Sequence, residues 1–496
     1  MIEIITNVNG IVNNFVWGIP MLVLLVGTGI LMTVLTRVFQ ISHFGYWVRH
    51  TLGSIFTDRH ITRHTEKEDQ SITQFQSLCT ALAATIGTGN IVGVSSALLF
   101  GGPGAIFWMW IVAFFGMMTN YSENVLGIYY RKKNARGEWS GGAMYYLRDG
   151  LGSRHGMKQV GAILAVLFSV FCLLASFGIG NMSQINSIAG NMKAAFGIPN
   201  AATGIVLMIL AGLVILGGIK RIASVTEKLI PFMAVFYIIG SLILCIVNAG
   251  RLVPALVSIF KGAFAMKAVG GGIVGAGIKM ALTWGMKRGV FSNEAGLGSS
   301  VMVHSSSNVR EPVRQGMWGI FEVFADTIVV CTLTALTVLT SGLVDLDSGA
   351  VISEAEGSAL VGEAFAGVFG QAGPAFIAIA ILLFAFSTVL GWSHYGSKAF
   401  EYLFGSGAII AYRVIFIIFI LFGATMSLDL AWDLSDTFNG LMAIPNLIGV
   451  LSLSPVVCRI TKNYVDRRIR GLKTEPMLSA FPKIQKQMAK ELNDSE

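Results

Sequence analysis

The sequence is poor in charged residues. Asp, Glu, Lys and Arg make up only 12% of its 496 residues, whereas soluble domains carry about 25%. Hydrophobic residues make up 54% of the chain, and the mean hydropathy is +0.69. We therefore predict an all-α polytopic membrane protein, with the lipid bilayer as its main solvent.

Cysteine and histidine are also scarce, and neither forms a recognisable site. No two cysteines have metal-binding or redox spacing, so we interpret them as small buried residues. The seven histidines have no metal-ligand spacing either. The sequence contains no nucleophile–base constellation, phosphate loop or zinc motif, so we predict no catalytic residues and no enzyme activity. The cysteines are Cys79, Cys172, Cys245, Cys331 and Cys458.

Long apolar runs dominate the chain instead. Eleven segments approach or exceed the length of about 20 residues that a helix needs to cross a bilayer. The N-terminus lacks the basic region of a cleavable signal peptide, so we expect the first run to be retained. The segments are 14–38, 71–100, 104–130, 160–189, 202–218, 229–248, 270–303, 316–341, 365–394, 408–428 and 436–458.

The basic residues collect in alternate loops. Loop 342–364 is acidic and has no Lys or Arg, and only loop 249–269 departs from the alternation. By the positive-inside rule we predict a multi-pass membrane protein, with the N-terminus outside and the C-terminus in the cytoplasm. These loops account for the net charge of +8, which therefore indicates no nucleic-acid partner. The basic segments are 37–70, 131–159, 218–228, 304–315 and the tail after Arg459.

Eleven segments divide usefully into one, five and five. Residues 71–265 and 266–460 then form two halves of five helices each. Because five is odd, the halves enter the membrane from opposite sides, which is the inverted-topology repeat of many secondary transporters. Residues 1–70 form an extra N-terminal helix with a cytoplasmic linker, and 461–496 form a basic cytoplasmic tail. We expect the protein to function as a monomer.

The first helix of each half carries glycines at membrane depth. The run A-L-A-A-T-I-G-T-G-N-I-V-G-V-S (81–95) places Gly87, Gly89 and Asn90 in an apolar segment, and 270–303 carries glycines throughout. An interrupted helix is tolerated in a bilayer only where its freed backbone groups face protein, water or a ligand. Interruptions at matching positions of two halves indicate a transport site. The alternative is a glycine face that lets two helices pack closely.

Several ionisable residues lie within or beside the apolar segments. We interpret Glu123, and Glu294 with Arg288, as internal ion pairs that lock helices or form a cytoplasmic gate. Glu322 and Asp326 are spaced i, i+4 on one helix face. They could instead relay protons, because a charge at membrane depth is a functional hypothesis by default.

Two further segments carry polar side chains at helical spacing. Phe177, Asn181 and Gln184 share one face, and they serve either a binding site or hydrogen bonds between helices. The adjacent hydroxyls of Ser387 and Thr388 suit a small hard cation that takes oxygen ligands. The alternative is that each hydroxyl bonds back to its own helix.

Four motifs together resemble the alanine/glycine:cation symporter family, whose type members are bacterial sodium:alanine symporters. They are T-A-L-A-A-T-I-G-T-G-N-I-V-G-V (80–94), G-G-P-G-A-I-F-W-M-W (101–110), G-I-G-N-M-S-Q-I-N (178–186) and K-R-G-V-F-S-N-E-A-G-L-G-S (287–299). The resemblance covers residues 70–460. It implies the leucine-transporter fold, with one extra N-terminal helix before a five-plus-five inverted core, and a location in the bacterial plasma (inner) membrane.

The resemblance also implies roles for residues. Backbone N–H groups at the break of the first core helix, at Thr88 and Gly89, would hold the substrate carboxylate. The break of the sixth core helix is expected near Thr283–Met286, and Trp392 and Met286 would limit the pocket to a small side chain. The implied substrate-binding residues are Thr88, Gly89, Phe177, Asn181, Gln184, Thr283, Trp284, Met286, Thr388 and Trp392.

The coupling ion implied by the resemblance is Na⁺. A second sodium site, present in some relatives, would fall near Thr85 and Asn90. The ligands implied for the first are the carbonyls of Ala83, Ile86 and Phe384 and the hydroxyls of Ser387 and Thr388.

We therefore predict sodium-coupled symport of small neutral amino acids, alanine and glycine, into the cell by alternating access. Because only pocket size would judge the side chain, uptake of D-alanine is a side prediction. The alternative is a proton-coupled symporter of the same fold. A channel, a membrane-embedded enzyme and a sensing transceptor are less consistent with the sequence.

Overall fold

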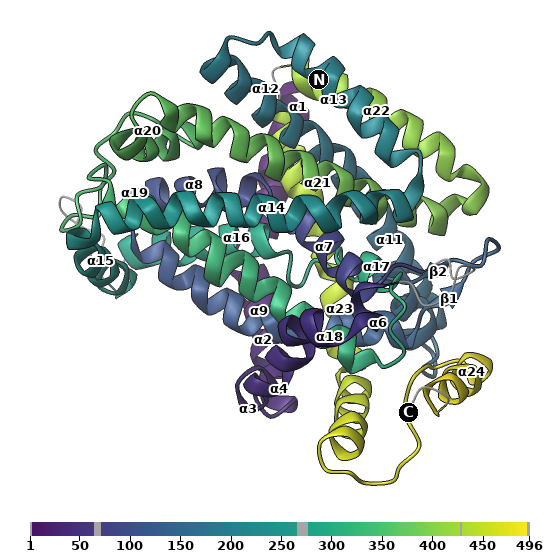
Figure 1. Cartoon of the computed structure of the whole chain (residues 1–496). Coiled ribbons are helices and arrows are strands. Elements are labelled where there is room, and N and C mark those ends of the chain that lie inside the picture. Colours follow the sequence, from purple (N-terminus) through teal and green to yellow (C-terminus); the bar gives the residue numbers. More distant parts are fainter. Residues whose placement is uncertain (1, 64–70, 265–275, 427–428, 494–496) are drawn as a thin grey trace.

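The chain folds almost entirely into helices (Figure 1). The structure, a computed structural model, describes residues 2–63, 71–264, 276–426 and 429–493. Strands within these ranges are limited to the short antiparallel hairpin of β1 (Lys132–Lys133) and β2 (Trp139–Ser140). The N-terminal part consists of α1 (Ile2–Val16), α2 (Ile19–Leu35), α3 (Phe39–Ser42), α4 (Phe44–Val48), η1 (Arg49–Gly53), α5 (Ser54–Thr57) and α6 (Arg59–Thr62).

The next part contains the first predicted half. Its helices are α7 (Gln74–Thr85), η2 (Thr88–Asn90), α8 (Val92–Gly101), α9 (Gly104–Tyr129), α10 (Ala143–Tyr145), η3 (Tyr146–Leu151), α11 (Lys158–Phe177), η4 (Gly178–Met182), α12 (Ser183–Phe196), α13 (Asn200–Ile215), α14 (Gly218–Val247), η5 (Ala249–Arg251) and α15 (Leu252–Phe264).

The remaining part contains the second predicted half and the tail. Its helices are α16 (Ala276–Asn293), α17 (Val301–His304), α18 (Pro312–Val323), η6 (Phe324–Cys331), α19 (Thr332–Thr340), α20 (Ser358–Phe369), α21 (Ala372–Phe404), η7 (Ser406–Ala408), α22 (Ile409–Thr425), α23 (Asp429–Arg468) and α24 (Pro482–Asn493).

The outer helices expose apolar side chains, as a protein in lipid does. Leu213 on α13 is 62% exposed and Ile246 on α14 is 70% exposed. Eight helices in the described ranges are long and apolar enough to cross a membrane, and the count is nine if the bent pair of α7 and α8 forms one span. The protein is therefore multi-pass.

The count of eleven spans and the inverted repeat stay predictions. α13, which overlaps predicted segment 202–218, has only 16 residues. Residues 270–275 of segment 270–303, and the predicted domain boundaries at 70 and 265, lie outside the described residues.

Helix α9 forms part of the centre and packs against α16 and α18. Glycines make the contact with α16 close. A Cβ added at Gly285 would lie 2.3 Å from the Ala105 carbonyl oxygen, and one at Gly289 would lie 2.5 Å from Val112 Cγ1. These glycines are therefore required for helix packing.

This packing corrects the predicted position of the second break. The break was expected near Thr283–Met286, but α16 runs without interruption from Ala276 to Asn293. The chain leaves the helix at Glu294, which has a φ of 56°, and resumes a helix only at Val301. The prediction was wrong because the glycines before Glu294 accommodate α9 and not an unwound backbone.

Candidate functional site

The first predicted break is confirmed. α7 ends at Thr85, η2 follows from Thr88 to Asn90, and the axes of the two half-helices differ by 59°. The Gly87 N–H donates to Asn90 Oδ1 at 2.9 Å, and the Thr88 N–H donates to Gln184 Oε1 at 3.3 Å. Side-chain oxygens therefore satisfy backbone donors that the interrupted helix leaves free.

Glycine is required at position 87 by its surroundings. A Cβ there would lie 2.4 Å from Thr388 Oγ1 and 3.3 Å from Gln184 Oε1. Gly391 acts in the same way from the other side, since a Cβ there would lie 2.8 Å from the Ala84 Cβ. These two glycines let α21 approach the end of α7.

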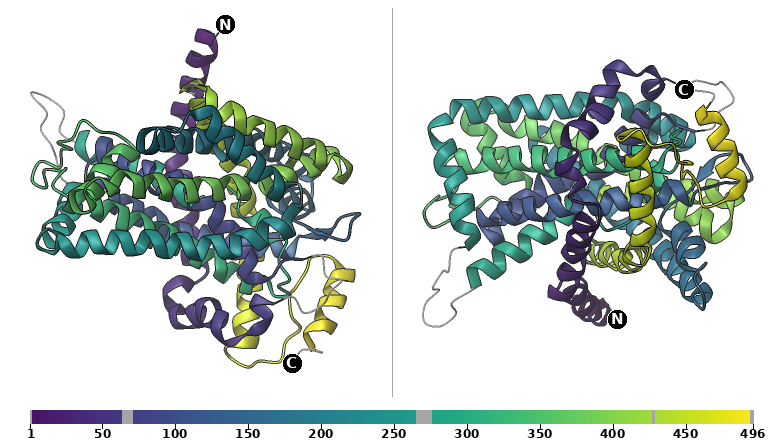
Figure 2. Two further views of the ribbon diagram at one scale, coloured as in Figure 1. Left: turned by 45° about the horizontal axis from the view of Figure 1, so that its top comes forward. Right: turned by 90° about the horizontal axis from the view of Figure 1, so that it is seen from below.

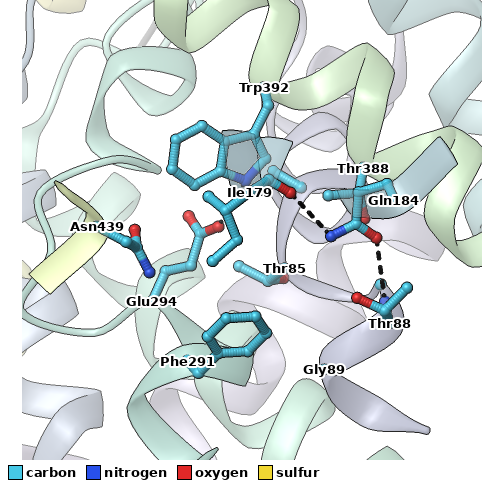
Figure 3. Close-up of a pocket in the computed structure, with 12 residues that line it drawn as sticks. Thr85, Thr88, Gly89, Ile179, Gln184, Phe291, Glu294, Thr388, Trp392 and Asn439 are labelled. Atoms are coloured by element: carbon cyan, nitrogen blue, oxygen red, sulfur yellow. Dashed lines mark hydrogen bonds between the residues drawn. The ribbon is translucent and has the colours of Figure 1, made fainter. Parts of the chain in front are cut away.

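A small cavity of about 20 Å³ lies at this break, which is room for about one water molecule. Figure 3 shows Thr88 and Gln184 on one side of the view and Glu294, Phe291 and Asn439 on the other. The lining residues are Ala84, Thr85, Gly87, Thr88, Gly89, Ile179, Gln184, Phe291, Glu294, Thr388, Trp392 and Asn439.

Half of the expected substrate residues line this cavity. They are Thr88, Gly89, Gln184, Thr388 and Trp392, and Thr85, which was expected at a second sodium site, joins them. The Thr88 hydroxyl oxygen is buried and has no hydrogen-bond partner in the described part of the chain. It is therefore available to a ligand.

The other expected residues lie elsewhere. Phe177 packs its ring 4.9 Å from Phe419, and Asn181 Nδ2 donates to the Phe416 carbonyl at 2.7 Å, which is the interhelical hydrogen bond of the alternative interpretation. Trp284 stacks on Phe100 at 4.5 Å. Thr283, Trp284 and Met286 all lie on α16, before its end, and are not among the lining residues.

The sequence did not identify Phe291, Ile179 or Asn439 as lining residues. Phe291 lies seven residues after Trp284, which is about two helical turns, so locating the break correctly would have found it. Ile179 lies inside the motif G-I-G-N-M-S-Q-I-N. Asn439 comes from α23, and no pattern in the sequence links that helix to the break.

The five oxygens expected to bind sodium lie together. Ser387 Oγ is 3.3 Å from the Ala83 carbonyl oxygen and 2.7 Å from that of Phe384. Thr388 Oγ1 is 3.5 Å from the Ile86 carbonyl oxygen and 3.1 Å from that of Phe384. The hydroxyls thus bond back to their own helix and also face the end of α7. Such a set of oxygens suits a hard cation.

The residues expected at a second sodium site have other partners. Thr85 Oγ1 donates to the Ala81 carbonyl at 3.3 Å. Asn90 Nδ2 donates to Asp326 Oδ1 at 2.6 Å, and Asp326 also accepts from Ser292 at 3.1 Å and from Thr327 at 2.7 Å. A buried carboxyl group, which sequence spacing did not place here, therefore lies beside Asn90.

The expected internal ion pairs are absent from the described residues. Glu294 accepts hydrogen bonds from Trp392 and Ser299, not from Arg288. Glu123 accepts from Asn446 Nδ2 at 2.5 Å. The prediction was wrong because side-chain amide, hydroxyl and indole donors take the place of cations.

Glu322 has an ionisable partner that the sequence did not suggest. His304 Nε2 lies 2.9 Å from Glu322 Oε2, and both side chains are fully buried. In the part of the chain that the structure describes, no three His, Cys, Asp or Glu side chains group as metal ligands. The proton relay through Glu322 and Asp326 stays a hypothesis.

A comparison with protein families gives a match that covers nearly the whole chain. The model of the Sodium:alanine symporter family matches residues 2–478. The chain belongs to this family. It is therefore an amino-acid transport protein of the membrane, and its relatives are transporters.

Individual relatives cover nearly the whole symporter. The sodium/alanine symporter AgcS of Methanococcus maripaludis is 46% identical over 457 residues, with 92% of this chain and 96% of the relative covered. The putative sodium/proton-dependent alanine carrier protein YrbD of Bacillus subtilis is 34% identical, with 93% and 92% covered. The probable sodium/glutamine symporter GlnT of Bacillus subtilis is 36% identical, with 95% and 93% covered.

A solved structure supports the fold. The crystal structure of MhsT in complex with L-phenylalanine matches with a TM-score of 0.50 at 14% identity, covering 80% of this symporter and 99% of that chain. At this identity the likeness concerns the fold alone. It agrees with the expected leucine-transporter fold.

Proposed function

We propose that the symporter couples the inward movement of sodium to the uptake of small neutral amino acids, alanine and glycine, by alternating access. The observation that carries the proposal is the break between α7 and α8. Within a few residues it offers carbonyls at the C-terminal end of one half-helix, which accept hydrogen bonds from two hydroxyls of α21, and N–H groups at the N-terminal end of the other half-helix.

The sodium ion would bind at the C-terminal end of α7, where the helix carries partial negative charge. The carbonyls of Ala83 and Ile86 belong to the last turn and C-cap of α7, where the helix dipole favours a cation. The Phe384 carbonyl and the hydroxyls of Ser387 and Thr388 complete five oxygens from two helices. Sodium bound there would hold α7 against α21 and so stabilise the substrate site.

The substrate carboxylate would bind at the start of the other half-helix. The N–H groups of Thr88 and Gly89 open η2 and lead into α8, where an anion is favoured. The substrate carboxylate would replace Gln184 Oε1, which accepts from the Thr88 N–H at 3.3 Å. The Thr88 hydroxyl, which has no partner among the described residues, adds a donor. Because Trp392 and Phe291 narrow the cavity, the side chain of the substrate would be selected by size, and D-alanine would be accepted where its methyl group fits.

The orientation and cytoplasmic location of the basic loops are part of the proposal. The tail contacts three segments predicted to be cytoplasmic: Phe481 lies under the Lys132 ammonium group at 4.4 Å, Arg467 pairs with Glu311, and Tyr464 contacts Tyr46. In Figures 1 and 2 the hairpin of β1 and β2 lies toward the opposite end of α14 from α15. This separation supports the predicted sidedness, with the C-terminus in the cytoplasm.

Proton coupling in the same fold is the second candidate. Asp326 lies beside Asn90 at the break, and His304 pairs with Glu322, both fully buried. Buried ionisable groups at membrane depth are typical of proton pathways. In that mechanism a pH gradient alone would drive uptake.

The test is uptake of labelled alanine into proteoliposomes. We expect an inward sodium gradient to drive alanine accumulation. A membrane potential that is negative inside the proteoliposomes should increase this accumulation, because one charge crossing 100 mV gains about 2.3 kcal/mol. Glycine and D-alanine should compete, whereas leucine should not. Accumulation that is unchanged in potassium, or that a pH gradient alone supports, would contradict sodium coupling.

A further inference from the structure

Glu294 is a buried carboxyl group at the cavity, and no cation pairs with it among the residues that the structure describes. It is 4% exposed and lines the cavity. The basic residues just before it point elsewhere: Lys287 pairs with Asp436 at 2.7 Å, and Arg288 lies over the rings of Trp284 and Phe291. The carboxylate therefore lacks a counter-charge of its own.

Two neutral donors hold the carboxyl group in place. Trp392 Nε1 donates to Oε1 at 2.9 Å, and Ser299 Oγ donates to Oε2 at 2.5 Å. A carboxylate offers about four acceptor positions, so its capacity is not exhausted by these two bonds. A buried carboxylate is stabilised best by a cation that also hydrogen-bonds to it.

The backbone around Glu294 favours a cation as well. α16 ends at Asn293, and the last carbonyls of a helix carry partial negative charge. Glu294 itself has a φ of 56°, a left-handed conformation that non-glycine residues adopt mainly under constraint and often at functional sites. The break after α16 thus concentrates negative charge on the cavity side of the helix end.

We infer that Glu294 binds the ammonium group of the substrate, while Trp392 and Ser299 position the carboxylate of Glu294. The inference rests on the proposed function and specifies its substrate class. The N–H groups of Thr88 and Gly89 would take the carboxylate end of a zwitterion, and Glu294 the ammonium end. Carboxylic acids of the same size that lack the amine are then excluded from the site. They would leave the Glu294 carboxylate without a cation and would bring a second carboxylate into the cavity.

The inference is tested by binding to purified protein in sodium, measured as stabilisation against thermal unfolding, which rises with ligand occupancy. Alanine is compared with propionate, which has the same carbon skeleton and no amine. We expect Glu294→Gln to raise the Kd for alanine by about 30-fold or more. The same variant should bind propionate at least as well as the wild type does, because it removes a repelling charge.

Two further variants separate this role from a structural one. Glu123→Gln removes another buried carboxyl group, which bonds to Asn446 and does not line the cavity, and should leave both affinities unchanged. Glu294→Asp keeps the charge but shortens the side chain, so it should raise the Kd for alanine by about 10-fold and still reject propionate. It also tests the inference if Glu294→Gln does not fold.

The outcomes are distinct. Unchanged alanine affinity in Glu294→Gln, or an equal loss of affinity for alanine and for propionate, overturns the inference and leaves the proposed function standing. If Glu123→Gln loses as much alanine affinity as Glu294→Gln does, the inference is also overturned. A wild-type protein that is stabilised by none of alanine, glycine and serine overturns the proposed function, and the inference with it.

Discussion

The two helix breaks beside the cavity differ in how their glycines are used. In the first break, Gly87 makes room for the side chains of Thr388 and Gln184. In α16, Gly285 and Gly289 make room for α9, and the helix continues past both. A glycine in a membrane helix therefore marks either an opened backbone or a close helix contact, and its neighbours decide which.

The largest effect is expected from closing the space at the first break. Gly87→Ala would place a methyl group 2.4 Å from Thr388 Oγ1, and overpacking of this kind costs about 1–3 kcal/mol. We expect sodium-driven alanine uptake in proteoliposomes to fall by about 100-fold.

Gly93→Ala is the matched control, because its nearest contact would be Arg288 Cδ at 3.9 Å. Its uptake should be near that of the wild type. Equal inactivation of the two variants would show that any added methyl group in this segment is harmful, and the contrast between glycines would be lost.

The next effect concerns the hydroxyls that face the break. Thr388→Ala removes one of the five proposed sodium ligands, and we expect the sodium concentration for half-maximal uptake to rise about tenfold or more. Thr388→Ser should retain most of the affinity.

Ser393→Ala provides the comparison on the same helix, since its hydroxyl donates to the Leu390 carbonyl one turn earlier. If Ser393→Ala shifts the sodium dependence as much as Thr388→Ala does, the five oxygens are not the ion site.

A smaller effect should distinguish the observed end of α16 from the expected one. Phe291→Ala widens the cavity and should lower the affinity for alanine about tenfold. The variant should also admit larger amino acids such as leucine as competitors. Trp284→Ala, at the position expected from sequence, should leave substrate preference unchanged. Competition assays with both variants decide the point, and a broadened range in Trp284→Ala alone would restore the original expectation.

The smallest effect on transport is expected from the packing glycines. Gly285→Ala should lower the free energy of unfolding by about 1–3 kcal/mol, without changing the sodium or alanine affinity of the folded protein. Gly190→Ala, where an added Cβ meets nothing within 4 Å, should be neutral or stabilising. A large change of affinity in Gly285→Ala would mean that α16 opens at this glycine after all.

Local patterns predicted much of this site. Glycines next to Thr88 and Asn90 predicted the first break, and the adjacent hydroxyls of Ser387 and Thr388 predicted a site suited to a hard cation. Both predictions depend on a few neighbouring residues, so no tertiary information was needed. The family resemblance supplied the pairing of these two elements.

The remaining features depend on contacts between distant helices. Whether Gly285 and Gly289 open the backbone or pack against a neighbour is decided by α9, which lies more than 150 residues earlier in the chain. Asn439 reaches the cavity from α23, and Asp326 meets Asn90 across 236 positions. Helical periodicity alone does not specify such neighbours.

The most direct test of the account is the sodium dependence of alanine binding to the purified symporter. If sodium and alanine bind on either side of one helix break, sodium should lower the Kd of alanine, and alanine should lower the Kd of sodium by the same factor, because coupling of binding is reciprocal. The same alanine Kd in sodium and in potassium, or a Kd that responds only to pH, would contradict the account.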